Sequence, residues 1–291
     1  MGVPGYLVQL FREAPSKRRL IRSLVLGGRG GDRTVTSSDG TSLSVRKSGE
    51  GDAVVMVHGA LDGIGGFSMI ELSIADRYAA WVYDRRGRGG SGDGSDYSLE
   101  REIEDLQAVL DAAGRPAHVI GHSLGALIAL AAAASGTKMR SLILYEPPLR
   151  QDQIDREVIE EVKALVARGE LDQAIEVMAI GLAGVSDDEL SIVRKIKPVW
   201  KQLRDGVRAT PRELDMVCDV DWGHFELPVG DRPVLVIRGG RECSPAYPRP
   251  GDLPRFVTDP EVVTIPDQGH LATNFAPNKF VEAVLDFIDR H

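Results

Sequence analysis

Short apolar runs recur along this chain without the polar–apolar alternation of a half-exposed strand. Runs of this kind are typical of strands buried on both faces, as they are in parallel sheets. The segments between them have helical spacing, and strands that alternate with helices favour a parallel α/β sheet. The pattern predicts strands at Ala53–Val57, Ala80–Tyr83, Ala117–Ile120, Ser141–Tyr145, Pro233–Ile237 and Glu261–Ile265, and helices at Gly66–Tyr78, Leu99–Ala113, Leu124–Ala134 and Pro277–Arg290.

Two regions depart from this alternation. Arg33–Ser37 and Ser42–Ser48 flank an Asp-Gly turn, which predicts an antiparallel start to the sheet. Residues 149–230 carry apolar stripes at helical spacing and no convincing strand. We therefore expect one α/β core formed by residues 33–148 and 231–291, with residues 149–230 inserted as a helical cap.

Residues 1–32 precede the sheet pattern. Apolar residues recur at helical spacing before and after Pro15, which predicts two short amphipathic helices broken at the proline. We interpret this segment as an arm that packs on the main domain or on a second copy of the chain, which would make the protein a homodimer. A basic helix lying on a membrane surface is the alternative interpretation.

Composition excludes several classes of protein. The chain of 291 residues has 35 Lys and Arg against 43 Asp and Glu, for a net charge of −8, and 43% of its residues are hydrophobic. Enough apolar residues are present to form a core, and the acidic charge argues against nucleic-acid binding. Two cysteines cannot form a disulfide framework, and no apolar stretch is long enough to span a membrane. We expect a cytoplasmic protein that binds no membrane.

One motif carries a specific chemistry. Gly121-His122-Ser123-Leu124-Gly125 lies between the predicted strand at residues 117–120 and the predicted helix at residues 124–134. In this strand–turn–helix context the pattern G-x-S-x-G is a nucleophile elbow, where a sharp turn exposes the serine hydroxyl. Glycines leave room for neighbouring backbone, and the helix N-terminus faces developing negative charge. Ser123 is therefore the candidate nucleophile.

From about residue 33 to residue 291 the chain resembles the α/β-hydrolase fold family. Besides the elbow, three motifs match in order. His58-Gly59-Ala60 follows a predicted strand, as the family's oxyanion loop does, and residues 84–91 (DRRGRGGS) look like the family's D-x-R-G-x-G-x-S loop. Gln268-Gly269-His270 lies between the last predicted strand and helix, where the family keeps its catalytic histidine.

The resemblance implies roles for several residues. His270 would take the Ser123 proton and return it to the leaving group. The backbone N–H groups of Ala60 and Leu124 would bind the oxyanion of a tetrahedral intermediate. His58 and His122 lie beside these motifs and are candidate substrate-binding residues, although we expect His58 to serve loop geometry. The remaining histidines have no partners at metal-ligand spacing, so we expect no metal and no cofactor.

The carboxylate that orients His270 has two candidates. Glu146 directly follows the strand at residues 141–145, a position used by some members of the family. Glu242 lies close to the commoner family position, after the strand at residues 233–237, where the usual aspartate is absent. We favour Glu146 because Pro147 restricts its backbone toward the extended region, whereas Glu242 follows two glycines in a loop. Glu242 remains the alternative.

Substrate identity is less readable. Met178 and Trp200 of the expected cap could line an apolar pocket, or form the cap's own core. The resemblance implies a cofactor-independent serine hydrolase that cleaves an ester, lactone or thioester of a small, apolar substrate through an acyl-enzyme. A C–C bond hydrolase, or a lyase, cyclase or small-molecule binding protein of the same fold, are the alternatives.

Overall fold

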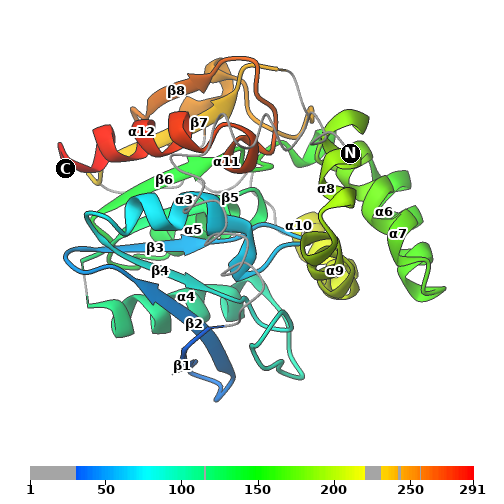
Figure 1. Cartoon of the computed structure of the whole chain (residues 1–291), viewed down its shortest axis with the longest axis horizontal. Coiled ribbons are helices and arrows are strands. Elements are labelled where there is room, and N and C mark those ends of the chain that lie inside the picture. The colour runs from blue at the N-terminus through cyan, green and yellow to red at the C-terminus, as the bar shows by residue number, and fades with distance from the viewer. Residues whose placement is uncertain (1–30, 115, 220–230, 242–243, 256) are drawn as a thin grey trace, which may run out of the picture.

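The protein forms an eight-stranded sheet covered by helices on both faces, as the computed structural model in Figure 1 shows. The structure describes residues 31–114, 116–219, 231–241, 244–255 and 257–291. The strands lie in the order β1-β2-β4-β3-β5-β6-β7-β8. β1 and β2 pair antiparallel, β2 pairs antiparallel with β4, and all other neighbours are parallel. The predicted parallel α/β sheet with an antiparallel start is confirmed.

The strands end together at one edge of the sheet. In the register, Val57 pairs with Gly121, His122 with Tyr145, and Gly239 with Ile265. The loops that follow these strands therefore meet at one edge, where open α/β sheets place their sites. The strands are β1 (Arg33–Thr36), β2 (Ser42–Ser48), β3 (Ala53–Val57), β4 (Ala79–Tyr83), β5 (His118–His122), β6 (Ser141–Tyr145), β7 (Val234–Gly239) and β8 (Glu261–Ile265).

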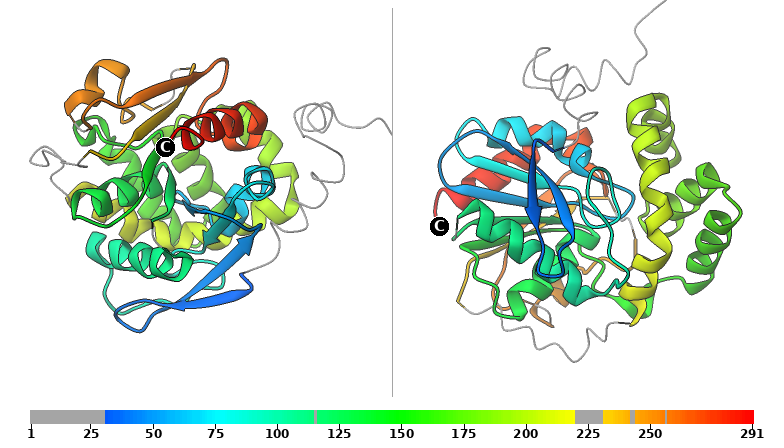
Figure 2. Two further views of the ribbon diagram at one scale, coloured as in Figure 1. Left: turned by 90° about the vertical axis from the view of Figure 1, so that its left-hand side faces the viewer. Right: turned by 90° about the horizontal axis from the view of Figure 1, so that it is seen from below.

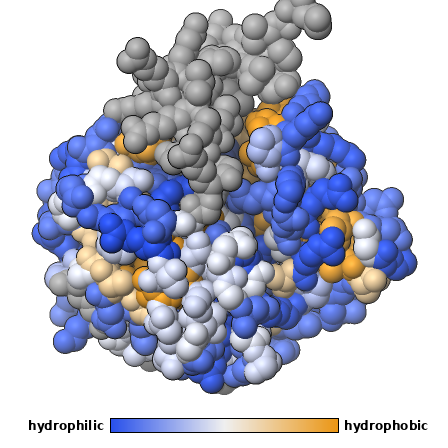
Figure 3. Space-filling model, turned by 60° about the horizontal axis from the view of Figure 1, so that its bottom comes forward, coloured by the Kyte–Doolittle hydropathy of each residue, from blue (hydrophilic) through white to orange (hydrophobic). Residues whose placement is uncertain are grey.

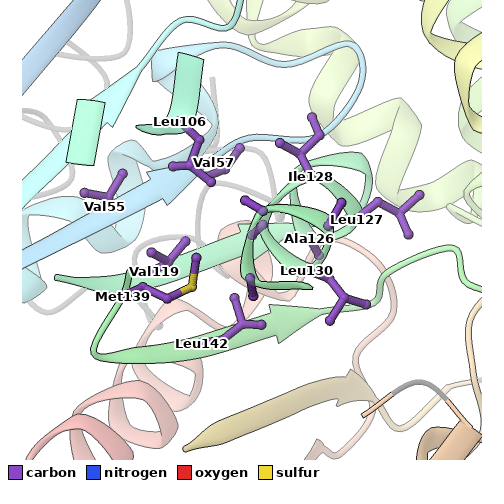
Figure 4. Packing of buried hydrophobic residues seen from close by; sticks show 14 of the residues in the cluster. Val55, Val57, Leu106, Val119, Ala126, Leu127, Ile128, Leu130, Met139 and Leu142 are labelled. Atoms are coloured by element: carbon purple, nitrogen blue, oxygen red, sulfur yellow. The ribbon is translucent and has the colours of Figure 1, made fainter. Parts of the chain in front are cut away.

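Successive strand residues point to opposite faces, and each face has its own core. Val55, Val119 and Leu142 pack against α4 (Leu99–Ala113) and α5 (Leu124–Ala134), as Figure 4 shows for α5. The alternate residues of the same strands pack against α3 (Ser68–Ile74) and α12 (Pro277–Ile288). This double burial explains the continuous apolar runs in the sequence.

The edge strand β8 differs from that expectation. Glu261 and Thr264 leave the strand partly solvated, and Val262 is 40% exposed. An edge strand has a neighbour on one side only, so β8 shows the alternation that the central strands lack. The predicted residue range of this strand is right, but its predicted burial on both faces is wrong.

Between β6 and β7 the chain forms helices that gather beyond one end of the sheet (Figures 1 and 2). They pack around a core of their own. Local sequence explains several boundaries: Asp155 caps α6, and Ser186 with Glu189 forms a capping box on α8. The segments are η2 (Gln151–Gln153), α6 (Arg156–Ala167), α7 (Leu171–Val177), the π-helix η3 (Met178–Leu182), α8 (Asp187–Lys195), α9 (Lys197–Gly206), η4 (Val207–Ala209) and α10 (Thr210–Asp219).

Buried ion pairs join this helical segment to the sheet. Glu213 on α10 accepts hydrogen bonds from Arg85 and Arg88, which lie in the loop after β4. Arg85 also pairs with Glu102 on α4 at 2.6 Å, and all four side chains are almost fully buried. Buried charges are tolerated only when paired, so these contacts anchor α10 to the core.

The outer surface is mostly hydrophilic on the face shown in Figure 3, where hydrophobic residues form separate small areas. In the described part of the chain, no helix has the length and apolar character that crossing a membrane requires. The predicted arm, apart from its last two residues, lies outside the described residues. The remaining short elements are η1 (Ile64–Phe67), η6 (Pro250–Arg255) and α11 (Ala272–Phe275).

Candidate active site

Ser123 occupies a strained turn between β5 and α5. Its backbone has φ 53° and ψ −122°, in a region that residues with a side chain rarely adopt. The turn packs tightly, because a Cβ on Gly121 would lie 2.5 Å from the Ala126 Cα and one on Gly125 would lie 2.1 Å from the Val57 oxygen. Glycine is therefore required at both positions. The turn directs the Ser123 side chain toward the cavities at the sheet edge.

His270 and Glu146 meet at this edge. His270 Nδ1 lies 2.7 Å from Glu146 Oε2, and both side chains are about 5% exposed. Glu146 Oε1 accepts a second hydrogen bond from the Gly239 N–H at 2.8 Å, so both carboxylate oxygens are held. The carboxylate therefore fixes the ring orientation of His270 and leaves Nε2 to face other groups.

The backbone conformation of Glu146 differs from the predicted one. Its φ is 45°, in the left-handed region, and not in the extended region expected before Pro147. Held between β6 and β7 by its backbone N–H bond to the Ile237 oxygen, the residue keeps this conformation and aims its side chain at His270. The alternative acid Glu242 lies outside the described residues.

Tyr247 contacts the other nitrogen of His270. Its hydroxyl lies 3.1 Å from Nε2, and the two rings stack with centroids 4.7 Å apart. Since Nδ1 donates to Glu146, Nε2 is the acceptor and the tyrosine hydroxyl donates. Among the described residues, no hydrogen bond joins Ser123 to His270. Tyr247 was not among the predicted site residues, because no motif marks this loop position after β7.

The predicted oxyanion donors surround Ser123. Leu124 is the first residue of α5, where a backbone N–H has no acceptor within the helix. The loop after β3 approaches closely, since a Cβ on Gly59 would lie 3.1 Å from the Ser123 Cβ. Ala60 follows Gly59 and lines the same hollow as Ser123 and Leu124. Both residues therefore lie near Ser123, and their role as oxyanion donors stays a prediction.

The two neighbouring histidines have different positions. His58 is fully buried, with Nδ1 2.8 Å from the Gly59 oxygen and Nε2 accepting from the Arg85 N–H at 3.0 Å. Burial, with the charges of Arg85 and Arg88, lowers the pKa of His58 well below its ordinary value. The ring therefore holds two loops together. It lines neither cavity at Ser123, so the structure does not place His58 in contact with a substrate there.

His122 does reach the cavity. Its ring lies between Tyr145 and His270, with centroid distances of 4.8 and 4.6 Å. Nε2 lies 3.1 Å from the His270 backbone oxygen and donates to it. Burial and the neighbouring His270 lower the pKa of His122 well below its ordinary value, so the ring is neutral. His122 therefore supports the His270 loop and forms part of the cavity wall.

Two apolar cavities meet at Ser123. The first, of about 170 Å³, is lined by Ser123, His122 and His270 together with side chains of α7, α8 and α9. The second, of about 270 Å³, is lined by Ser123, Leu124 and Tyr247. Residues that line both cavities are Ala60, Ser123, Met178 and Ala183.

Met178 and Trp200, the two candidate pocket residues of the helical segment, lie at different places in the structure. Met178 lines both cavities and also packs in the core of the helical segment, so both interpretations describe it. Trp200 lines neither cavity, so of the two interpretations only the core one describes it: it packs in the helical core and borders a different hollow beside Lys201 and Arg204. Its indole N–H donates to Asp172 at 3.0 Å. Helical spacing placed both residues on apolar faces but could not say which face meets the sheet.

In the described residues, no group of three or more His, Cys, Asp and Glu side chains could hold a metal ion. The arrangement at the sheet edge is a serine beside a carboxylate-oriented imidazole, between two apolar cavities. An imidazole of this kind can accept and return a proton, and a serine in such a turn can act as a nucleophile.

The fold and this site define an α/β hydrolase, and the comparisons agree: residues 54–283 match the model of the alpha/beta hydrolase family, and the chain belongs to that family. An alpha/beta hydrolase from Sphaerobacter thermophilus has 33% sequence identity, a TM-score of 0.75, and coverage of 88% of this chain and 100% of that one.

Two named hydrolases are also similar over most of their length. The 2-(acetamidomethylene)succinate hydrolase of Mesorhizobium japonicum is 24% identical over 260 residues, which are 85% of this chain and 92% of that protein. The N-formylmaleamate deformylase of Pseudomonas putida is 25% identical over 260 residues, which are 84% of this chain and 91% of that protein. These relatives support an enzyme that hydrolyses its substrate.

Proposed function

We propose that this protein is a serine hydrolase that cleaves an ester, lactone or thioester through an acyl-enzyme. The observation that carries the proposal is the 2.7 Å contact between His270 and Glu146 at the same sheet edge as the strained Ser123. An imidazole oriented by a carboxylate is what a serine needs to become a nucleophile.

The steps follow from the positions of these groups. Ser123 Oγ bonds to the carbonyl carbon while its proton passes to His270 Nε2, which the Tyr247 hydroxyl must first vacate. Negative charge then develops on the carbonyl oxygen, toward the N–H groups of Ala60 and Leu124. The intermediate collapses, the bond to the leaving group breaks, and that group takes the proton from His270. Water then repeats the sequence and releases the acid.

The surroundings favour carbonyl compounds with apolar parts on both sides of the reacting bond. The two cavities at Ser123 are lined mainly by aliphatic side chains, and they receive the two halves of such a substrate. Desolvation in this site strengthens the interactions with the developing charge.

The experiment is labelling by a fluorophosphonate probe together with a panel of esters, lactones and thioesters. Ser123→Ala should remove labelling and lower kcat by about 10⁴-fold or more, because only the nucleophile is lost. Ser135→Ala, a hydroxyl at the far end of α5, is the matched control. Labelling that survives Ser123→Ala would reject the proposal. A wild-type protein that is never labelled would favour a lyase, a cyclase or a binding protein.

A further inference from the structure

Asp62 places a carboxyl group in the first cavity, beside the predicted catalytic side chains. It follows the His58-Gly59-Ala60 loop after β3, and it is half-buried. Its Oδ1 accepts a hydrogen bond of 3.3 Å from the Gln202 side chain on α9. That contact is long, and it comes from a neutral group. No role in the chemistry proposed above requires a carboxylate at this position.

The charge of Asp62 is poorly compensated. Among the described residues that line the first cavity, none is a lysine or an arginine. Arg88 is the nearby cation, but its guanidinium is paired with Glu213 and reaches only the backbone oxygen of Asp62, at 3.5 Å. Asp84 adds negative charge nearby, and its carboxylate accepts hydrogen bonds from the N–H groups of Ile64 and Gly90.

These surroundings affect the ionisation of Asp62. Burial raises its pKa to about 7, although the Gly63 N–H and Arg88 act in the opposite direction and Asp84 adds to the rise. A cation that enters with the ligand would stabilise an ionised Asp62, because the Coulomb attraction between the two charges is weakly screened in an apolar cavity.

The first cavity is also the side on which a leaving group would lie. His270 lines the first cavity and not the second, whereas Leu124 lines the second and not the first. The imidazole must hand its proton to the leaving group, so that part of the substrate must be next to His270. The acyl part then extends into the second cavity.

We propose that Asp62 selects substrates whose leaving group carries an amine, as its ammonium ion, and that it rejects leaving groups that carry a carboxylate. The substrate class is an ester or related acyl compound of an amino alcohol. This inference rests on the serine hydrolase proposed above. It also separates this chain from the relative from Mesorhizobium japonicum, because the succinate in that relative's name is a dicarboxylate.

Three butyrate esters of nearly equal length test the inference: ω-aminopentyl, hexyl and ω-carboxypentyl butyrate. At about pH 8 the wild-type protein should hydrolyse the amine with a kcat/KM at least about 10-fold above that of the hexyl ester, and the carboxylate at least about 10-fold below it. Asp62→Asn, which keeps size and hydrogen bonding, should bring all three values within about 3-fold of one another.

A matched control removes the same charge from the other cavity. Asp155 lines the second cavity and caps α6. Asp155→Asn should leave the order of the three esters unchanged. Equal ratios in the wild-type and Asp62→Asn proteins would overturn the inference, and so would a change of order caused by Asp155→Asn alone.

Binding without turnover separates this inference from the proposed function. In a Ser123→Ala background, the Kd of ω-aminopentyl butyrate should rise about 10-fold when Asp62→Asn is added, while that of the hexyl ester should change by less than about 3-fold. Preserved hydrolysis in Ser123→Ala would reject the serine hydrolase and not the ammonium site. Equal binding of both esters, or of neither, with Asp62 present would reject the ammonium site.

Discussion

The two halves of the candidate site are built in different ways. The sheet supplies Ser123 and Glu146 directly after β5 and β6 and His270 from the loop after β8, and hydrogen bonds hold each of them in place. The helical segment between β6 and β7 supplies aliphatic side chains such as Met178, Ile192 and Leu203, which meet the cavity through packing alone. In the proposed mechanism, hydrogen bonds therefore position the reacting groups, whereas the packed helices shape the space for the substrate.

Among the substitutions in the sheet half, loss of the proposed orienting acid Glu146 should lower activity most. Glu146→Gln keeps the size of the side chain but removes the charge that stabilises a protonated His270. We expect kcat to fall by at least about 10²-fold with a modest change in KM, because that charge develops only during the reaction. Steady-state kinetics on any active ester measures this effect.

Glu242→Gln is the matched comparison, and it should lower kcat by less than about 10-fold, or about 1.4 kcal/mol. Glu157→Gln, on the solvent side of α6, controls for the loss of one carboxylate. A larger loss from Glu242→Gln than from Glu146→Gln would assign the acid to the loop after β7 and leave the serine hydrolase proposal in place.

Two substitutions in the helical half should distinguish a residue that lines the cavities from one that only packs in the helical core. Met178→Ala enlarges both cavities, so we expect the ratio of kcat/KM between long and short acyl esters to change by about 10-fold. Trp200→Ala should leave that ratio unchanged and lower the Tm by several degrees, because the indole packs in the helical core. An equal loss for every ester after Met178→Ala would place Met178 with the core.

A substitution at Tyr247 tests whether its hydroxyl occupies His270 Nε2 in the absence of a substrate. Its hydroxyl competes with Ser123 for His270 Nε2. Tyr247→Phe keeps the stacked ring and removes that hydrogen bond. We expect fluorophosphonate labelling of Ser123 to become about 2- to 10-fold faster, which is the worth of one hydrogen bond. Slower labelling would show that the hydroxyl assists the reaction.

The last prediction concerns stability where the two halves meet. The folded protein binds the Asp62 proton more tightly than the unfolded chain, because burial raises the pKa from 3.8 to about 7. Protonated Asp62 therefore adds to the free energy of unfolding. This contribution is complete below the unfolded pKa of 3.8 and is lost as the pH rises through about 7. Asp62→Asn should melt above the wild type at about pH 8, by a margin that shrinks toward about pH 5. Melting curves at both pH values check this, and a constant margin would contradict it.

Local sequence patterns were sufficient for much of the fold. β2, β3, β6, β8, α4 and α5 begin and end at the predicted residues, since apolar periodicity and turn residues act over short distances. The elbow at Ser123 was also predictable, because its strand, turn and helix are contiguous in the sequence. α3 is shorter than predicted and follows a 3₁₀ turn at Ile64–Phe67, a boundary that periodicity does not mark.

Contacts between distant residues were decided by the tertiary structure. The pairing of Glu146 with His270 depends on the register of β6 beside β7, and the approach of Tyr247 depends on a loop without a motif. Met178 lies at the cavities and Trp200 lies away from them. This difference depends on the orientation in which α7 to α9 pack against the rest of the protein. A sequence determines which face of a helix is apolar, but the neighbour that this face meets is set by packing across the whole chain.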